Sequence, residues 1–370
     1  MVNKESDNIY SFGFSSMIFT LIKAVFFGLG TYIMFNISKG DIVTSSIFGF
    51  LVSFLYFGVI YYIVSKNEYK DIFELNEAMF GKVFGTAINY YLGFAYFAIA
   101  SIILYNLSNF INIEYLNTSN LNYIKSLLLV PVIYASTKKL SSLIKMNQIF
   151  AFITFSIIIF SLLGIFGRFE IFNVEPLFTA GVKSITHSTL VYFSCIVVAL
   201  SILPIVSIKT IIDKVNLKSN MLGAFIITNI TQIVIIVFTL IALGIEFILI
   251  FRYPEYVSLK QFELFKIFER VENILALRYL FNAFCLLSFI YYYILRIFSV
   301  NRKKETGSYI LSFVLVVITA LIFGYNSLFI DFIMKYLVWI NMIGIFLPMM
   351  LIFIRMLYYN KRKTNLSIKM

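Results

Sequence analysis

The stretch FGFSSMIFTLIKAVFFGLGTYIMFN, residues 12–36, is apolar over most of its length and long enough to cross a lipid bilayer as a helix. It holds one charged side chain, Lys23, and the sequence Gly28-Leu29-Gly30-Thr31. Glycine has no Cβ, so two glycines this close together permit a helix to unwind locally. The stretch therefore predicts a transmembrane helix whose glycines serve either a local interruption or close packing against a neighbouring helix.

Similar apolar stretches follow along the whole chain of 370 residues, of which 61% are hydrophobic and 13% charged. A soluble domain has about 45–50% apolar and about 25% charged residues. We expect an all-α polytopic membrane protein with about ten transmembrane helices, in a single membrane domain that covers residues 1–370. The expected spans are 12–36, 42–64, 86–111, 121–137, 147–167, 184–208, 221–250, 273–299, 307–325 and 333–359.

The net charge of +12 comes from Lys and Arg residues in the short connectors between these spans. This distribution is typical of a topology signal, whereas a nucleic-acid-binding protein carries a basic stripe on one face. Connectors rich in basic residues alternate with poorer ones, which predicts that both termini are cytoplasmic. In the connector 251–272 acids balance the bases, so we place it outside. Its residues 257–272 have the period of an amphipathic helix at the outer interface.

Ten spans with both ends on one side divide into two sets of five, residues 12–167 and 184–359. Because five is odd, the second set crosses the membrane in the opposite sense, which is the inverted-repeat plan of many secondary transporters. In that plan the binding site lies where helices one and six are interrupted. Span six offers Ser188, Thr189, Ser194 and Pro204. Small residues in membrane helices more often serve close packing, so both interpretations stay open.

Among the charged side chains within the expected spans we single out Lys23 and Arg278, because charge inside a membrane is costly and suggests function. Lys23 either faces a central cavity and holds a carboxylate, from a ligand or another subunit, or it snorkels or pairs with a neighbouring helix. For Arg278, about two turns into span eight, we favour snorkelling to the outer headgroups.

Motifs for catalysis, cofactors or metals are missing from the sequence. It has one His and two Cys, no Walker-type phosphate loop, and no nucleophile with a base placed beside it. We therefore expect a protein that is not an enzyme, with no cofactor and no metal.

Several segments together resemble the B subunit of spore germinant receptors, a branch of the amino acid–polyamine–organocation transporter superfamily. Tyr253-Pro254 followed by Phe268-Glu269-Arg270-Val271-Glu272 resembles the most specific motif of that family. Phe80-Gly81-Lys82-Val83-Phe84-Gly85 resembles its entry to span three, Asn173-Val174-Glu175-Pro176 its element before span six, and Gly28-Leu29-Gly30 its span-one glycines. The chain departs from the family at Phe35, Tyr105-Asn106 and Tyr279, where the family commonly has Pro, Arg-Glu and Trp.

The resemblance implies a LeuT-type fold of five plus five helices with helices one and six broken. It implies a role in spore germination: sensing a small germinant, usually an amino acid, at the inner membrane of the dormant spore. Such proteins work with a membrane-bound A subunit and a C-subunit lipoprotein.

Six residues are the candidate lining of the germinant site. The resemblance supplies only Gly28 and Gly30, which with Thr31 would contribute backbone groups. Helix position adds Tyr96, Tyr192 and Ser194 as pocket-lining side chains, and Lys23 as a possible charge partner. For both tyrosines, lipid or helix contact is the commoner role.

Two other functions stay open. An amino-acid permease would share the fold and the site but carry its substrate across the membrane. A structural subunit that binds no ligand would retain the fold while its pocket has degenerated.

Overall fold

The computed structural model describes residues 9–69, 71–165, 178–260, 272–299 and 327–368, all in helices and short connections. The first apolar span consists of α1 (Phe12–Val25), the π-helical turn η1 (Phe26–Gly30) and α2 (Thr31–Ser38). The helices after it are α3 (Ile42–Lys66), α4 (Ile72–Phe80), α5 (Lys82–Glu114), α6 (Leu121–Ser136), α7 (Leu140–Ile165), α8 (Gly181–Leu200), α9 (Leu217–Ile248), α10 (Pro254–Lys260), α11 (Glu272–Ser299), α13 (Ser327–Asn341) and α14 (Leu347–Ile368), with the wide turn η7 (Met342–Phe346) joining the last two.

Seven helical segments within the described ranges are long and apolar enough to cross a membrane. One of them, Phe12–Lys66, contains the first two expected spans, and α6 is apolar but shorter. Helices form here because a bilayer supplies no partner for backbone N–H and C=O groups, so each segment must satisfy its own. The expected span 307–325 lies outside the described residues, as does most of the expected amphipathic helix 257–272.

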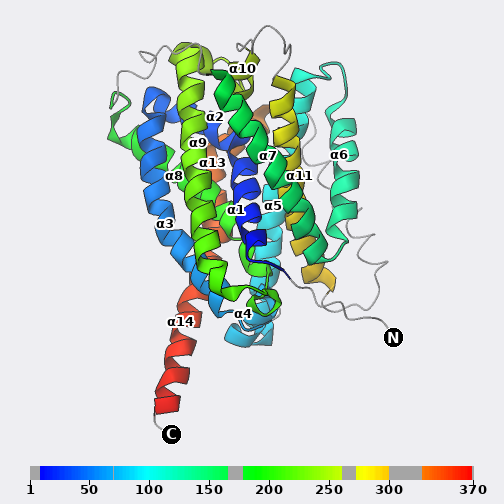
Figure 1. Ribbon diagram of the computed structural model, residues 1–370, viewed down its shortest axis with the longest axis vertical. Helices are drawn as coiled ribbons and strands as arrows, with labels where there is room; N and C mark the ends of the chain where they lie inside the picture. The colour runs from blue at the N-terminus through cyan, green and yellow to red at the C-terminus, as the bar shows by residue number, and fades with distance from the viewer. Residues whose placement is uncertain (1–8, 70, 166–177, 261–271, 300–326, 369–370) are drawn as a thin grey trace.

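The helices form one bundle with α1 at its centre, flanked by α7 and α9 (Figure 1). Nearly every side chain of α1 is buried, which matches its apolar character on all sides. The start of α1, the end of α14 and the short helix α4 lie at one end of the bundle, and α10 lies at the opposite end (Figure 1).

Two glycines explain how α4 turns into α5. Gly81 separates the helices with φ of +83°, a conformation that glycine adopts readily. Gly85 lies on the first turn of α5, and a Cβ there would stand 2.5 Å from the backbone oxygen of Asn76 in α4. The two helices therefore pack backbone against backbone, which accounts for the glycine spacing seen in the sequence.

Candidate functional site

The first apolar span is interrupted at Phe27 and Gly28, which decides between the two interpretations of its glycines. Phe27 (φ −61°, ψ 123°) and Gly28 (φ +63°, ψ 0°) leave the helical conformation, and both are buried. Side chains satisfy the carbonyl groups that the break frees: Thr31 Oγ1 donates to the Phe26 carbonyl (2.9 Å) and Asn106 Nδ2 to that of Phe27 (3.0 Å). Non-helical backbone within a membrane protein is tolerated only where protein buries it or it lines a cavity.

An aromatic cluster closes over this break. The ring of Tyr253 lies directly against Gly28, where a Cβ would come within 2.4 Å of the ring. The Tyr253 hydroxyl donates to the carbonyl of Asn106 (3.0 Å). Phe27 stacks on Tyr279 with 4.1 Å between ring centroids, and Asn106 Nδ2 contacts the Tyr279 hydroxyl at 2.7 Å. The motif Tyr253-Pro254 thus places the aromatic ring on the break, and Pro254 begins α10.

Two of the residues that depart from the family pattern, Asn106 and Tyr279, contact each other at the break. They come from α5 and α11, two helices that pack side by side.

Three buried charges lie beside the break. Lys23 of α1, Glu255 of α10 and Arg278 of α11 are each 5% exposed or less. Each interacts electrostatically with the other two. Lys23 Nζ also donates to Gln232 Oε1 of α9 at 3.0 Å, and Thr31 lies next to the Glu255 carboxylate. Glu255 Oε1 is buried and has no hydrogen-bond partner.

The snorkelling interpretation of Arg278 is therefore wrong. Its side chain is 5% exposed because α10 packs against α11 and brings Glu255 beside it. The sequence places α10 in a connector whose charges look balanced along the chain, so no local signal marks Glu255 as buried. The three charges are assembled by contacts between elements far apart in sequence.

The remaining candidate residues divide between several places. Tyr192 faces the break, since its ring lies 4.7 Å from that of Phe26, and its hydroxyl donates to Asn229 Oδ1 of α9 (2.7 Å). Gly30 is close to α8 as well, because a Cβ there would stand 2.8 Å from Cys195 Sγ. Ser194 faces away, donating to the Val191 carbonyl and accepting a long contact from Asn341 of α13.

Tyr96 belongs to a separate cluster. Its ring lies 4.6 Å from that of Tyr293 on α11, its hydroxyl is buried without a hydrogen-bond partner, and Tyr56 lies nearby. That cluster surrounds Ser201, where α8 ends and gives way to short 3₁₀ turns at Leu203–Ile205 and Ile208–Thr210. The sixth expected span is therefore α-helical as far as Leu200 and continues as 3₁₀ turns.

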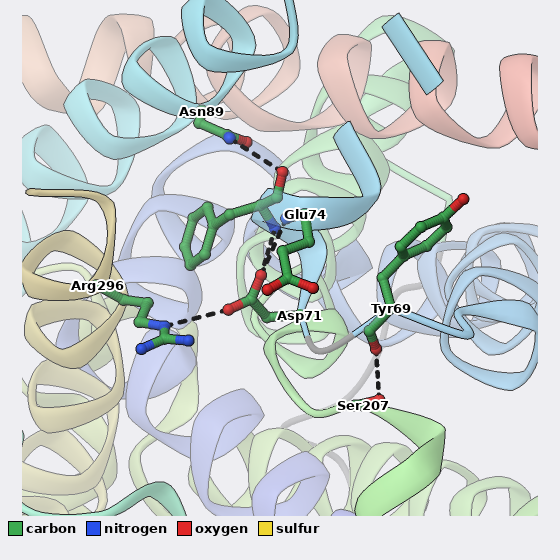
Figure 2. A network of polar contacts seen from close by, with 7 residues as sticks. Tyr69, Asp71, Glu74, Asn89, Ser207 and Arg296 are labelled. Carbon is green, nitrogen blue, oxygen red and sulfur yellow. Dashed lines mark hydrogen bonds and ion pairs between the residues drawn. The ribbon is translucent and has the colours of Figure 1, made fainter. Parts of the chain in front are cut away.

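A polar network ties elements together at the end of the bundle near α4 (Figure 2). Asp71 Oδ1 accepts from the N–H groups of Phe73 and Glu74 (both 3.0 Å), which caps α4. Its other oxygen pairs with Arg296 Nε of α11 at 3.1 Å. Ser207, which follows α8, donates to the carbonyl of Tyr69.

The residues just before α1 are held at the same end of the bundle by contacts with the segment that follows α8. Ile9 forms a parallel β-bridge with Ile211, and Ser11 donates to both carboxylate oxygens of Asp213 through its N–H (2.6 Å) and hydroxyl (2.5 Å). Burial works against the charged form of Asp213, but the hydrogen bonds from Ser11 outweigh it and hold its pKa below the ordinary value. In the part of the chain that the structure describes, no group of three or more His, Cys, Asp and Glu residues could hold a metal ion.

A family model described as "Spore germination protein" matches residues 14–329. Among solved structures, a Na⁺-coupled sialic acid symporter in a substrate-bound, outward-open state is similar with a TM-score of 0.59 and 12% sequence identity, covering 92% of this chain and 80% of the symporter chain. That similarity shows a transporter fold of the LeuT type and nothing beyond the fold. No curated protein matches the sequence.

Proposed function

This chain belongs to the family of spore germination proteins, and on that premise we propose that it is the B-type subunit of a germinant receptor. It is an integral membrane protein with a transporter-like fold, and neither the family nor the fold is enzymatic. In this proposal it binds a small germinant of the amino-acid class inside the bundle. It then signals germination through a membrane-bound A subunit and a C-subunit lipoprotein, in the inner membrane of the spore.

The proposed architecture is ten spans in two inverted sets of five, residues 12–167 and 184–359, within one domain. Helices one and six would both be broken, as in LeuT-type transporters. Both termini would be cytoplasmic, so that the end with α4 faces the spore core and α10 faces outward.

The observation that carries the proposal is the buried break at Phe27 and Gly28, which lies beside two buried cations, Lys23 and Arg278. A break in a membrane helix offers backbone groups and a helix end to a ligand carboxylate. Charged side chains buried within a membrane protein usually mark a substrate pathway.

The proposed site therefore keeps Gly28, Gly30 and Thr31 as backbone contributors and Lys23 as charge partner. Tyr192 contacts η1 through Phe26 and lines the same region. Tyr96 and Ser194 remain proposed lining residues; they would join the site only through a rearrangement, since they now contact Tyr293 and Asn341.

The test is germination of spores that lack this gene. Dipicolinate release is followed across a panel of amino acids and small organic acids, with uptake of the same compounds measured in growing cells. Loss of response to one compound with normal uptake supports the receptor. Normal germination with impaired uptake identifies a permease instead.

A spore that carries Gly30→Val provides the second arm. The new side chain must displace Cys195 or Phe26, which lie 2.8 and 3.2 Å from the Cβ position. We expect the response to be lost while the protein stays in the membrane. Gly58→Val is the matched control, because nothing lies within 4 Å of its Cβ position. An unchanged response with Gly30→Val would place the site elsewhere.

A further inference from the structure

The three buried charges next to the break do not balance. In their ordinary ionised forms Lys23 and Arg278 contribute two positive charges and Glu255 one negative charge, and all three side chains are almost completely buried. A buried charge without a partner is strongly unfavourable, because burial removes its hydration. Gln232 and Thr31, the polar groups beside them, are neutral.

No other buried acid of the described residues is available to supply the missing negative charge. Only two further acidic side chains are buried in that part of the chain, Asp41 and Asp71. Asp41 accepts from the N–H groups of Phe178 and Ala180, and Asp71 caps α4 and pairs with Arg296. Both are therefore engaged elsewhere.

We propose that a ligand with a net negative charge completes this cluster, its carboxylate binding between Lys23 and Arg278. This inference rests on the proposed function and names the ligand class more narrowly. The ligand is a small carboxylic acid without a compensating ammonium group, or an acidic amino acid. A zwitterion would leave the charge of the cluster at +1, whereas a monoanion cancels it.

The side chains of this cluster also match a carboxylate better than a spherical anion such as chloride. The guanidinium of Arg278 presents a planar fork of donors that matches the two oxygens of a carboxylate. The ammonium of Lys23 is held toward the cluster by Gln232 at 3.0 Å.

The experiment measures binding to the purified full-length chain, with matched pairs of probes that differ mainly in charge. L-lactate is compared with L-alanine, and L-aspartate with L-asparagine, in buffers with and without chloride. We expect the anionic member of a pair to bind about tenfold or more tightly than its partner, the effect of one charge-assisted pairing. Equal affinities for the two members of both pairs would overturn the inference.

Two substitutions should change anion binding in opposite directions, and a third is a control. Lys23→Met should abolish the preference for the anion, because the protein charges then balance without a ligand. Glu255→Gln should strengthen anion binding, since it removes the competing carboxylate. Lys125→Met is the matched control, because Lys125 is another buried lysine, on α6 near Tyr105, and the preference should not change. A preference that survives Lys23→Met would contradict the charge argument.

The thermal midpoint measured without ligand distinguishes a loss of binding from misfolding of the variant. The thermal midpoint of Lys23→Met should equal or exceed that of the wild type, because an uncompensated buried charge is gone. Chloride that alone raises the wild-type midpoint and blocks lactate would identify chloride as the occupant and overturn the carboxylate.

The outcomes also separate this inference from the proposed function. Tight binding of an amino acid with no charge preference overturns the inference and leaves the receptor in place. Absence of binding by every probe, with normal germination of spores that lack the gene, overturns both.

Discussion

Gly28→Ala tests the contact on which the broken helix depends. Glycine has φ of +63° at this position, and a residue with a Cβ loses about 1–2 kcal/mol in the left-handed region. The new methyl group would also lie 2.4 Å from Tyr253 Cε1 and 2.5 Å from its Cδ1. Forcing extra atoms into a packed interior costs about 1–3 kcal/mol. The expected loss is therefore about 2–5 kcal/mol.

The assay is unfolding of the purified protein by SDS in mixed micelles, which yields a free energy for each variant. The matched control is the same substitution in a Tyr253→Leu background, where the ring that the new methyl group meets is gone. There Gly28→Ala should lose only the backbone contribution of about 1–2 kcal/mol.

Equal losses for Gly28→Ala in the wild-type and the Tyr253→Leu backgrounds would refute the reasoning. They would mean that the Tyr253 ring moves aside freely and does not hold the break in place. Its hydrogen bond to the Asn106 carbonyl would then contribute little to the position of α10.

Three further predictions concern the end of the bundle near α4. Gly85→Leu should lose about 1–3 kcal/mol or more in the same unfolding assay, because α4 backbone lies 2.5 Å from its Cβ position, while Gly223→Leu, with open space around it, should lose little. Asp71→Ala removes both a helix cap of about 1 kcal/mol and an ion pair of at most about 1 kcal/mol, so it should destabilise more than Arg296→Gln, and equal losses would show that the cap is dispensable. Because the pKa of Asp213 is lowered, its ionised carboxylate contributes fully to folding stability above the ordinary carboxyl pKa, and this contribution is lost as the pH falls through the lowered value. The thermal midpoint of the wild type should therefore fall more steeply below about pH 4 than that of Asp213→Asn.

The membrane class and the positions of most helices could be predicted from the sequence, while the break in the first span was one of two interpretations of its glycines. Apolar runs of this length leave a helix as the available structure, because the backbone must satisfy its own hydrogen bonds in lipid. Gly28 marks the break because its conformation is a local property of a residue without a Cβ. Lys23 stood out for a similar reason, as a single charge inside an apolar run.

The sequence was a poorer guide to which residues lie together in the candidate site. Helical periodicity gives the face of a helix on which a residue lies, but not which neighbour that face meets. Tyr192 and Ser194 are two residues apart and therefore face different directions, one toward Phe26 and the other toward Asn341. Both were expected in one pocket because the sequence shows only how deep in the membrane each residue lies.

The sequence by itself determined that this chain is helical and lies in a membrane, since both depend on residues next to one another. The tertiary structure decided between a break and close packing at Gly28. Only the tertiary structure decided that Arg278 is buried and that Glu255 is its neighbour. Their pairing depends on α10 packing against α11 and the break, and an arginine near a helix end is equally compatible with the headgroups when viewed along the chain. Burial and charge balance are sums over neighbours in space, and the neighbours of Arg278 come from α1 and α10, which lie elsewhere in the sequence.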